Sequence, residues 1–438
     1  MVVLGSVLSF SNPTLADTTA VTASYTTTRD TTITATPAFA AADAPPSPRA
    51  HRLATLDGLR GVLALAVVFY HGAIYHRFVG DGTWTQPPSQ VYTLLGQSGV
   101  AMFFMVTGYL FWSRLIAEAG RPSWLRLYIG RVFRIGPLYL VAAGAMVMVA
   151  FAAAGGHLIV VPGQFAREVG VWLTLGLVQG GNVNGYPGGS LLLAGVTWTL
   201  RYEWMFYIAL PFAALAARRT WSHLPFAVAG LVALLAWAKT AAGTLFSLEL
   251  AFDALFLAGM VCASLHAKGV VARLPDAVAS VLVLALLAGT FTQFPHAYMP
   301  GAVLLLGGAF YPVASGCTVF GLLVSRPARR LGDVSYGIYL LQGLALAAVF
   351  RTGLAPALDA AAPAYHWGLM LLCAVLLVAL ATALHAAVER PGIALGRRAA
   401  AAVERRLLRL GRERVWSQGR PQGKRMRADE AAAGSPEV

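Results

Sequence analysis

Apolar residues along this chain fall in blocks of about 20, the length that crosses the hydrocarbon of a bilayer as a helix. In lipid each backbone amide must be satisfied within its own segment, so these blocks predict helices. The pattern therefore predicts an all-α integral membrane protein with a polytopic helical bundle. We expect ten transmembrane helices, over 57–77, 97–117, 131–154, 197–217, 222–240, 245–266, 277–293, 300–324, 333–352 and 366–388.

A shorter apolar stretch, residues 168–180, lies in the longest loop, and loop charges decide whether it crosses the membrane. If it does not cross and the N-terminus is cytoplasmic, the inside loops carry nine Lys and Arg residues and the outside loops carry one, Arg167. Short cytoplasmic loops favour positive residues, and a crossing here would invert every later loop. We therefore expect a short re-entrant or interfacial helix on the outer side, with both termini cytoplasmic.

Composition agrees with a membrane protein. The chain is 57% hydrophobic and 12% charged, with a mean hydropathy of +0.65, whereas soluble domains carry about 25% charged residues. The net charge of +14 sits between spans and in the C-terminal tail, so membrane anchoring explains it and no nucleic-acid partner is expected. Cys262, Cys317 and Cys373 lie in apolar runs without metal-ligand spacing, which predicts free thiols and no metal.

The two ends of the chain differ from the apolar middle. Residues 1–50 are rich in Ala, Thr, Ser and Pro, which is typical of disorder or of a start codon assigned too far upstream. Residues 51–394 form the predicted transmembrane domain. Residues 395–438 form a basic cytoplasmic tail, which is expected to begin helical and to be partly disordered. We see no soluble catalytic domain at either end and place any chemistry within the bundle.

The first span carries Arg60 and His71, which are eleven residues apart. At 3.6 residues per turn both face the same way, about 16 Å apart along the axis. Arg60 alone is explained by snorkelling to the cytoplasmic boundary. His71 is too deep for that, and an ionisable residue at such depth usually faces a functional cavity. Burial favours its neutral imidazole, which accepts a proton.

Other polar residues have competing interpretations. Arg131 and Arg134 share a face at the cytoplasmic surface, where they either clamp phosphates or anchor the span at the interface. Glu203 enters from the outer side with Tyr207 one turn further, and it either has a function or forms a structural pair with a Tyr or with Arg201.

Five segments, in this order, resemble the acyltransferase family 3 of membrane-bound O-acyltransferases, and the resemblance covers about 53–398. The matching residues are Arg60 and His71; Phe103 to Gly108, with Thr107 where the family has Ser; Arg131 and Arg134; Trp198 to Pro211, with Thr199 for Ser; and Glu389-Arg390-Pro391. One departure is Gln342, which stands where many members carry a second His.

The resemblance implies an O-acetyltransferase of the bacterial inner membrane, which moves acetyl from cytoplasmic acetyl-CoA to a hydroxyl of an envelope carbohydrate. No bound cofactor is implied, because acetyl-CoA (or a longer acyl-CoA) is the donor substrate. The site residues implied are His71 as general base with Arg60 and Glu203; Arg131 and Arg134 for the donor; and Thr107, Trp198 and Tyr207 in supporting roles.

The acceptor stays open at this point: O-antigen, exopolysaccharide, peptidoglycan, a lipid-linked sugar and a macrolide-like small molecule are all compatible. A transporter or flippase for a glycolipid or acyl group is the alternative function. It predicts movement of a substrate without covalent change. Transporters often contain broken helices at matching positions in two halves of the chain, and no such internal repeat is visible.

Overall fold

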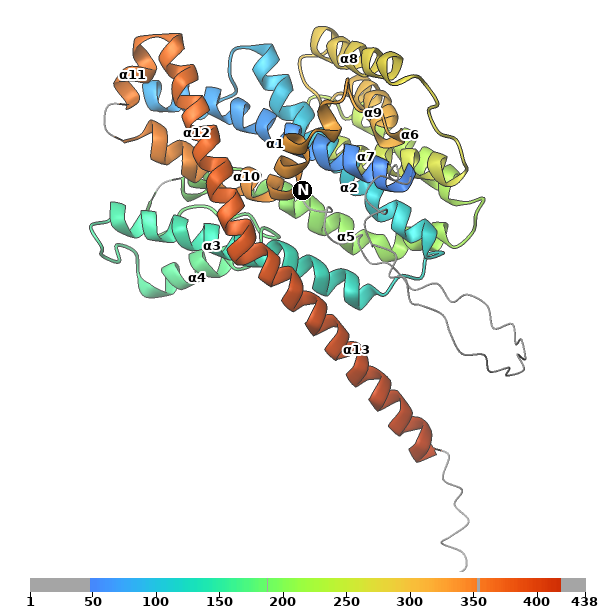
Figure 1. The fold of residues 1–438 in the computed structure, drawn as a ribbon. Coiled ribbons are helices and arrows are strands. Elements are labelled where there is room, and N and C mark those ends of the chain that lie inside the picture. The colour runs from blue at the N-terminus through green and yellow to red at the C-terminus, as the bar shows by residue number, and fades with distance from the viewer. Residues whose placement is uncertain (1–47, 187, 353–354, 419–438) are drawn as a thin grey trace, which may run out of the picture.

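The computed structural model describes residues 48–186, 188–352 and 355–418, and its described part is all-helical (Figure 1). The disorder predicted at both ends falls on segments 1–47 and 419–438, which lie outside the described residues. The helices are α1 (Pro48–Asp81), α2 (Gln90–Ala117), α3 (Trp124–Ala153), α4 (Pro162–Trp172), α5 (Trp198–Ala217), α6 (His223–Thr240), α7 (Leu245–Ala267), α8 (Asp276–Gln293), α9 (Pro300–Ser315), α10 (Arg326–Phe350), α11 (Ala355–Ala361), α12 (Pro363–Leu384) and α13 (Arg390–Gln418). Short turns are η1 (Gly189–Leu193), η2 (Leu322–Val324) and the π-helical turn η3 (His385–Glu389).

Each of the ten predicted spans coincides with a helix, and the protein is a multi-pass membrane protein. Within the described residues, eight helices are long and apolar enough to cross a membrane: α1, α2, α3, α6, α7, α8, α10 and the continuous α12–α13. The other two predicted spans are α5, whose first turns are polar and aromatic, and α9, which is apolar but shorter. The number of ten spans therefore stays a prediction.

The bundle is centred on α1, which packs between α2 and α10 (Figure 1). Glycines set these close approaches. A Cβ atom at Gly332 of α10 would meet the Asp57 carbonyl oxygen at 2.0 Å, and one at Gly61 of α1 would meet the Ala328 carbonyl oxygen at 2.6 Å. Small residues at helix crossings allow backbones to approach in this way in membrane bundles.

The contact between α2 and α7 is built in the same manner. A Cβ atom at Gly108 would meet the Phe256 carbonyl oxygen at 2.1 Å, and one at Gly259 would meet the Met105 carbonyl oxygen at 2.0 Å. The three cysteines are free and buried, as predicted.

Several helices begin or end away from the predicted bounds, and three of these differences have a local cause or shift a whole element. The span predicted over 300–324 ends at Ser315, because Gly316 takes a left-handed conformation (φ 115°) and stops the helix. The short helix predicted over 168–180 is α4, which begins at Pro162 and ends at Trp172. The span predicted from residue 333 begins at Arg326, because the Ser325 side chain accepts a bond from the Ala328 amide and caps the helix there.

The segment after α4 reaches the middle of α10. Residues 192–194, in and just after η1, lie against Gly343, where a Cβ atom would meet the Ala194 nitrogen at 2.2 Å. Tyr339 Oη lies 3.4 Å from the Val196 carbonyl oxygen, one turn earlier on α10. The deep part of this loop is therefore η1 and the residues after it, C-terminal to the stretch that hydropathy singled out.

The predicted boundary at residue 394 does not coincide with a structural break. The helix continues through it from α12 into α13, which packs against α3 and extends beyond the bundle (Figure 1). Gly392 and Gly396 allow this approach, because Cβ atoms there would meet Pro137 and Phe133 at 2.7 Å and 2.5 Å.

Candidate functional site

Arg60 and His71 both face α10, as their spacing on α1 predicts. Arg60 Nη2 donates to Ser335 Oγ at 3.0 Å, and His71 Nδ1 lies 3.2 Å from Gln342 Oε1. Their side chains are 1% and 9% exposed. Two helices in register therefore hold a buried guanidinium in the first half of α1 and a buried imidazole about three turns further along.

The hydrogen bonds of His71 define which ring nitrogen carries the proton. Nδ1 lies 3.0 Å from the Val67 carbonyl oxygen, which only accepts, so Nδ1 is the protonated nitrogen of the neutral ring. Gln342 Nε2 donates to the Tyr339 carbonyl at 2.8 Å, and this orients Oε1 toward His71 as a second acceptor. This arrangement leaves His71 Nε2 as the proton acceptor.

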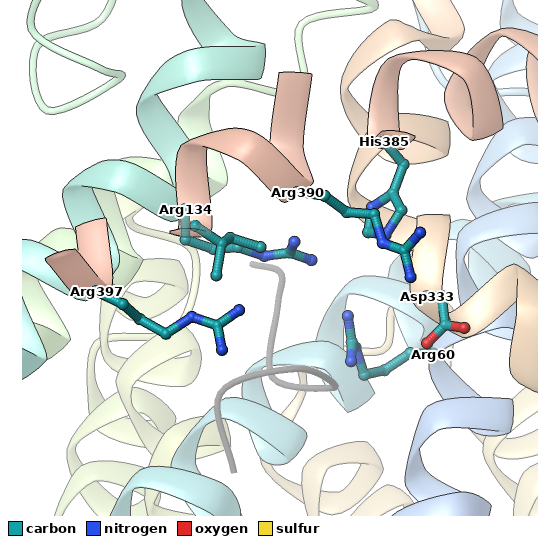
Figure 2. Close-up of a pocket in the computed structure, with 7 residues that line it drawn as sticks. Arg60, Arg134, Asp333, His385, Arg390 and Arg397 are labelled. Carbon is teal, nitrogen blue, oxygen red and sulfur yellow. The ribbon is translucent and has the colours of Figure 1, made fainter. Parts of the chain in front are cut away.

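A cavity of about 240 Å³ lies at the Arg60 end of the bundle and is strongly basic (Figure 2). Figure 2 shows the guanidinium groups of Arg60, Arg134 and Arg390 directed toward a common space, with His385 and Asp333 at its side. The lining residues are Arg60, Arg134, Asp333, His385, Arg390, Ile393 and Arg397. Arg60 and Arg134 are buried, whereas Arg390 and Arg397 are exposed. Such a concentration of positive charge attracts anions, and planar guanidinium groups are well suited to phosphate.

Several charged atoms around this cavity lack hydrogen-bond partners. Within the described residues these are Nε of Arg60, Nε of Arg134 and Oε1 of Glu389. Arg134 is held in place by an ion pair, in which its Nη1 lies 2.8 Å from Glu389 Oε2. Buried donors without partners are costly, and the two Nε atoms are such donors in arginines that line the cavity.

A π-helical turn supplies one side of this cavity. It spans His385–Glu389, and π-helical turns are frequent at functional sites. Glu389 is fully buried, and His385 Nδ1 lies 3.2 Å from its Oε2. The sequence motif Glu389-Arg390-Pro391 therefore places its carboxylate on Arg134 while Arg390 lines the cavity.

The predicted pair of Arg131 and Arg134 divides between two environments. Arg134 lines the cavity, whereas the Arg131 guanidinium carbon lies 5.0 Å from the Phe111 ring centroid and 6.0 Å from that of Tyr207. Positions i and i+3 of a helix differ by about 60° around its axis, so side chains on the same face still reach different partners. Arg134, and not Arg131, is thus among the residues that line the basic cavity.

Glu203 and Tyr207 form a buried pair on α5. Tyr207 Oη donates to Glu203 Oε1 at 2.9 Å, and both side chains are fully buried. The Tyr207 hydroxyl also interacts with Arg131. Of the two interpretations given for Glu203, the structural pair with a tyrosine is present, and the functional role stays a prediction; the side chain that bonds His71 Nδ1 is Gln342.

Polar groups on one face of α10 connect the two ends of the site. Ser335 bonds Arg60, Gln342 bonds His71, and Tyr339 lies between them with its Oη 3.1 Å from Thr199 Oγ1. These α10 residues are spaced four and three apart, the repeat of one helix face.

The remaining predicted residues, Thr107 and Trp198, lie in packed surroundings. Thr107 is 3% exposed on α2 beside Gly108, at the crossing with α7. Trp198 begins α5 within an aromatic cluster, with its ring centroid 4.9 Å from that of Phe252 and 5.8 Å from that of Tyr202.

Sequence reasoning missed several residues of the site. Asp333 lies in the third turn of α10, the helix that Ser325 caps, and it lines the cavity. Arg397 was assigned to the tail, yet it also lines the cavity, two helical turns after Arg390. The spacing of seven between these two arginines was the available signal, because it places them on the same helix face.

Comparison with known proteins finds relatives along most of the chain. Residues 53–384 match a protein family described as an acyltransferase domain. The exopolysaccharide production protein ExoZ of Rhizobium meliloti (strain 1021) is 30% identical over 292 residues, which cover 61% of this chain and 82% of the relative. The acyltransferase MdmB of Streptomyces mycarofaciens is 29% identical over 326 residues, which cover 67% of this chain and 79% of the relative. No solved structure matches.

Proposed function

This chain belongs to acyltransferase family 3 and is an O-acyltransferase, and we propose that it moves an acetyl group from cytoplasmic acetyl-CoA to a hydroxyl of an envelope or extracellular carbohydrate. One observation carries the proposal: a basic cavity lined by two buried arginines with unpartnered Nε donors lies beside Arg60 of α1, and a buried histidine with a free proton-accepting nitrogen lies about three turns further along the same helix.

The donor would place its phosphates in the basic cavity. Arg60 and Arg134 offer buried donor atoms, and Arg390 and Arg397 add positive charge at the same place. At about 240 Å³ the cavity is smaller than the roughly 300 Å³ at the low end of small-molecule pockets, so it suits the phosphorylated end of CoA and not the whole donor. The long thin arm of CoA spans the roughly 16 Å that separate Arg60 from His71 along α1.

The proposed reaction is direct acyl transfer with His71 as general base. The acceptor hydroxyl donates its proton to His71 Nε2 while its oxygen attacks the thioester carbonyl carbon. The bond between that carbon and the CoA sulfur breaks, and the thiolate takes the proton from His71. Hydrogen bonds from Nδ1 to Val67 and Gln342 hold the ring during both transfers and stabilise the imidazolium between them.

The acceptor class rests on the named relative. ExoZ is an exopolysaccharide production protein, which favours a polysaccharide or its lipid-linked precursor as the acceptor. We place the chain in the bacterial inner membrane with the basic cavity on the cytoplasmic side, because the positively charged loops are expected there and acyl-CoA is made there. The acceptor then reaches His71 from the outer side, where Glu203, Trp198 and Tyr207 are candidate supporting residues.

The test is acetyl transfer by the purified full chain in lipid vesicles. Labelled acetyl-CoA is supplied on one side of the vesicle membrane, and a polysaccharide extract from the cells that make this protein is supplied on the other. The label incorporated into the polysaccharide is then measured. Loss of the general base should lower the rate about 10²- to 10⁴-fold in His71→Ala. His157→Ala, an exposed histidine in the loop after α3, is the matched control. A His71→Ala rate equal to that of the wild type would refute the mechanism, and passage of a substrate without covalent change would favour a transporter.

A further inference from the structure

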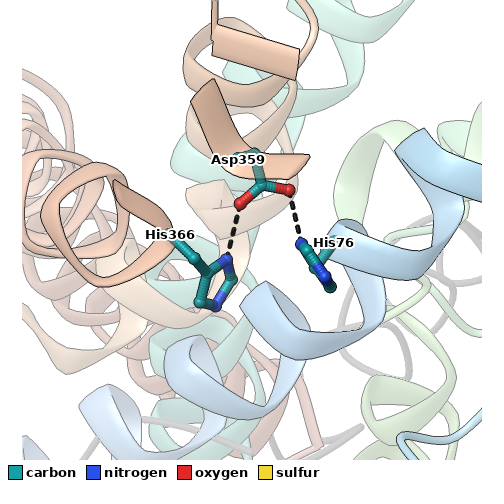
Figure 3. A group of neighbouring side chains, drawn as sticks. All are labelled: His76, Asp359 and His366. Carbon is teal, nitrogen blue, oxygen red and sulfur yellow. Dashed lines mark hydrogen bonds and ion pairs between the residues drawn. The ribbon is translucent and has the colours of Figure 1, made fainter. Parts of the chain in front are cut away.

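Three side chains from three different helices meet away from the acyl-transfer site. His76 comes from α1, Asp359 from α11 and His366 from α12 (Figure 3). Asp359 Oδ2 lies 2.6 Å from His76 Nδ1, and Asp359 Oδ1 lies 2.7 Å from His366 Nδ1. Figure 3 shows the two imidazoles approaching the carboxylate from either side, so that each oxygen faces one ring nitrogen.

The carboxylate of Asp359 is buried, and a buried charge needs a compensating partner. Asp359 is 3% exposed, and the groups that contact its two oxygens are the imidazole nitrogens of His76 and His366. A divalent cation bound by Asp359 and by the two Nδ1 atoms, with each ring carrying its proton on Nε2, would compensate that charge and hold all three side chains together.

The donor set matches a transition-metal site. Imidazole nitrogen and carboxylate oxygen are ligands of Zn²⁺, at about 2.0–2.2 Å, and three protein ligands with water in the remaining position is a common arrangement. One donor atom from each of His76, Asp359 and His366 lies within 4.8 Å of the others, so an ion among them needs shifts of only an ångström or so.

The surroundings provide both access and support. The His76 side chain is 47% exposed, so an ion and its water ligand reach the site from solvent, whereas His366 is 13% exposed. The His366 ring packs against Phe350 and Trp367, with centroids 5.8 Å and 5.9 Å apart, and this fixes its orientation. An apolar shell of this kind around a metal site limits solvent access and strengthens binding.

We propose that His76, Asp359 and His366 bind one divalent transition-metal ion, with Zn²⁺ as the best match, and that the ion ties α11 to α1 and α12. No local sequence motif reveals such a site, because His76 and Asp359 are 283 residues apart. The site lies five residues beyond His71 on α1, so the tie would brace the end of the helix that carries the base. It does not depend on the proposed acyl transfer.

The experiment measures metal binding by the full chain, purified in lipid nanodiscs with an affinity tag free of histidine. The protein is stripped with a chelator, dialysed against Zn²⁺ and analysed for metal by mass spectrometry, and its melting temperature is measured with and without Zn²⁺. We expect about one Zn²⁺ per chain and a higher melting temperature, because a ligand that binds the folded state stabilises it. Co²⁺ in place of Zn²⁺ should give visible absorption bands that report the ligand geometry.

Variants separate this site from adventitious binding. His76→Ala removes a half-exposed ligand and should fold, and it should weaken Zn²⁺ binding at least about 10-fold and abolish the thermal shift. His366→Ala and Asp359→Asn should do the same, whereas His157→Ala, in an exposed loop, should bind like the wild type. Equal Zn²⁺ binding by the wild type and His76→Ala, or less than stoichiometric metal in the wild type, overturns the proposal and leaves a hydrogen-bonded clamp. Acyl-CoA is absent from these measurements, so their result is independent of the proposed reaction.

Discussion

Replacing Gln342 tests whether the orientation of His71 matters for catalysis. Gln342→Leu keeps the approximate volume but removes Oε1, which lies 3.2 Å from His71 Nδ1. The Val67 carbonyl at 3.0 Å still accepts from Nδ1, so the tautomer survives and one of two restraints is lost. A neutral hydrogen bond contributes about 0.5–1.5 kcal/mol, which corresponds to a fall in kcat of about twofold to about tenfold. This is far smaller than the loss expected for His71→Ala.

The assay compares kcat and KM for labelled acetyl-CoA in lipid vesicles among the wild type, Gln342→Leu and Gln342→Glu. Glu keeps a side-chain oxygen at the same position, so it should recover most of the rate that Leu loses, and the pH profile of kcat should change because a carboxylate now faces the ring. The donor KM should stay constant in both variants, because Gln342 is not among the residues that line the basic cavity. A Gln342→Leu enzyme with wild-type kcat, or one altered only in donor KM, would refute the positioning role.

Two further predictions concern the donor cavity and the helix crossings. Arg134→Ala should raise the KM for acyl-CoA about 10-fold to about 100-fold, since a hydrogen bond to a charged group contributes about 1.5–3 kcal/mol. Arg131→Ala should leave that KM nearly unchanged, because Arg131 contacts aromatic rings and does not line the cavity. Arg121→Ala, at an exposed loop position, serves as the control. Steady-state kinetics at varied acyl-CoA decides this, and equal KM values for the Arg134 and Arg131 variants would contradict the assignment. Gly332→Ala should destabilise the fold by about 1–3 kcal/mol or more, because its Cβ atom would lie 2.0 Å from the Asp57 carbonyl oxygen, whereas Gly144→Ala meets nothing within 4 Å. Thermal unfolding in detergent measures both, and equal melting temperatures would count against a tight crossing of α1 and α10.

The helices were predictable from the sequence because hydrophobic length is a strong constraint in a bilayer. The helix boundaries were harder to predict. Ser325 and Gly316 set helix ends within or beside apolar runs, and hydropathy is insensitive to capping and to positive φ. The shared face of Arg60 and His71 followed from helical periodicity, since both bond α10. Their partners on α10, Ser335 and Gln342, could not be predicted from periodicity, because a local pattern carries no information on contacts between distant segments.

The division of Arg131 and Arg134 shows this limit most clearly. Their i, i+3 spacing left a phosphate clamp and interfacial anchoring open, and the family resemblance implied that both bind the donor, yet the two side chains reach different neighbours. Arg134 is paired with Glu389, which arrives from a π-helical turn more than 250 residues away in the chain. Nothing in the spacing of the two arginines encodes that turn, and Glu389-Arg390-Pro391 entered the sequence analysis only as one of the segments that resemble the family, without a role in the site.

The separation between the basic cavity and His71 is fixed by the way α1 and α10 meet. Gly61 and Gly332 bring the two backbones together closely enough that an axial slip would drive backbone atoms into each other. The same two helices supply the bonds of Arg60 and of His71, so one contact sets both ends of the proposed donor path. A donor of fixed length, held by its phosphates at one end, would therefore present its reacting carbon at a constant distance from the base. This rigid register favours catalysis by positioning, in which the protein gains rate by holding reactants in place and not by large motions of the bundle.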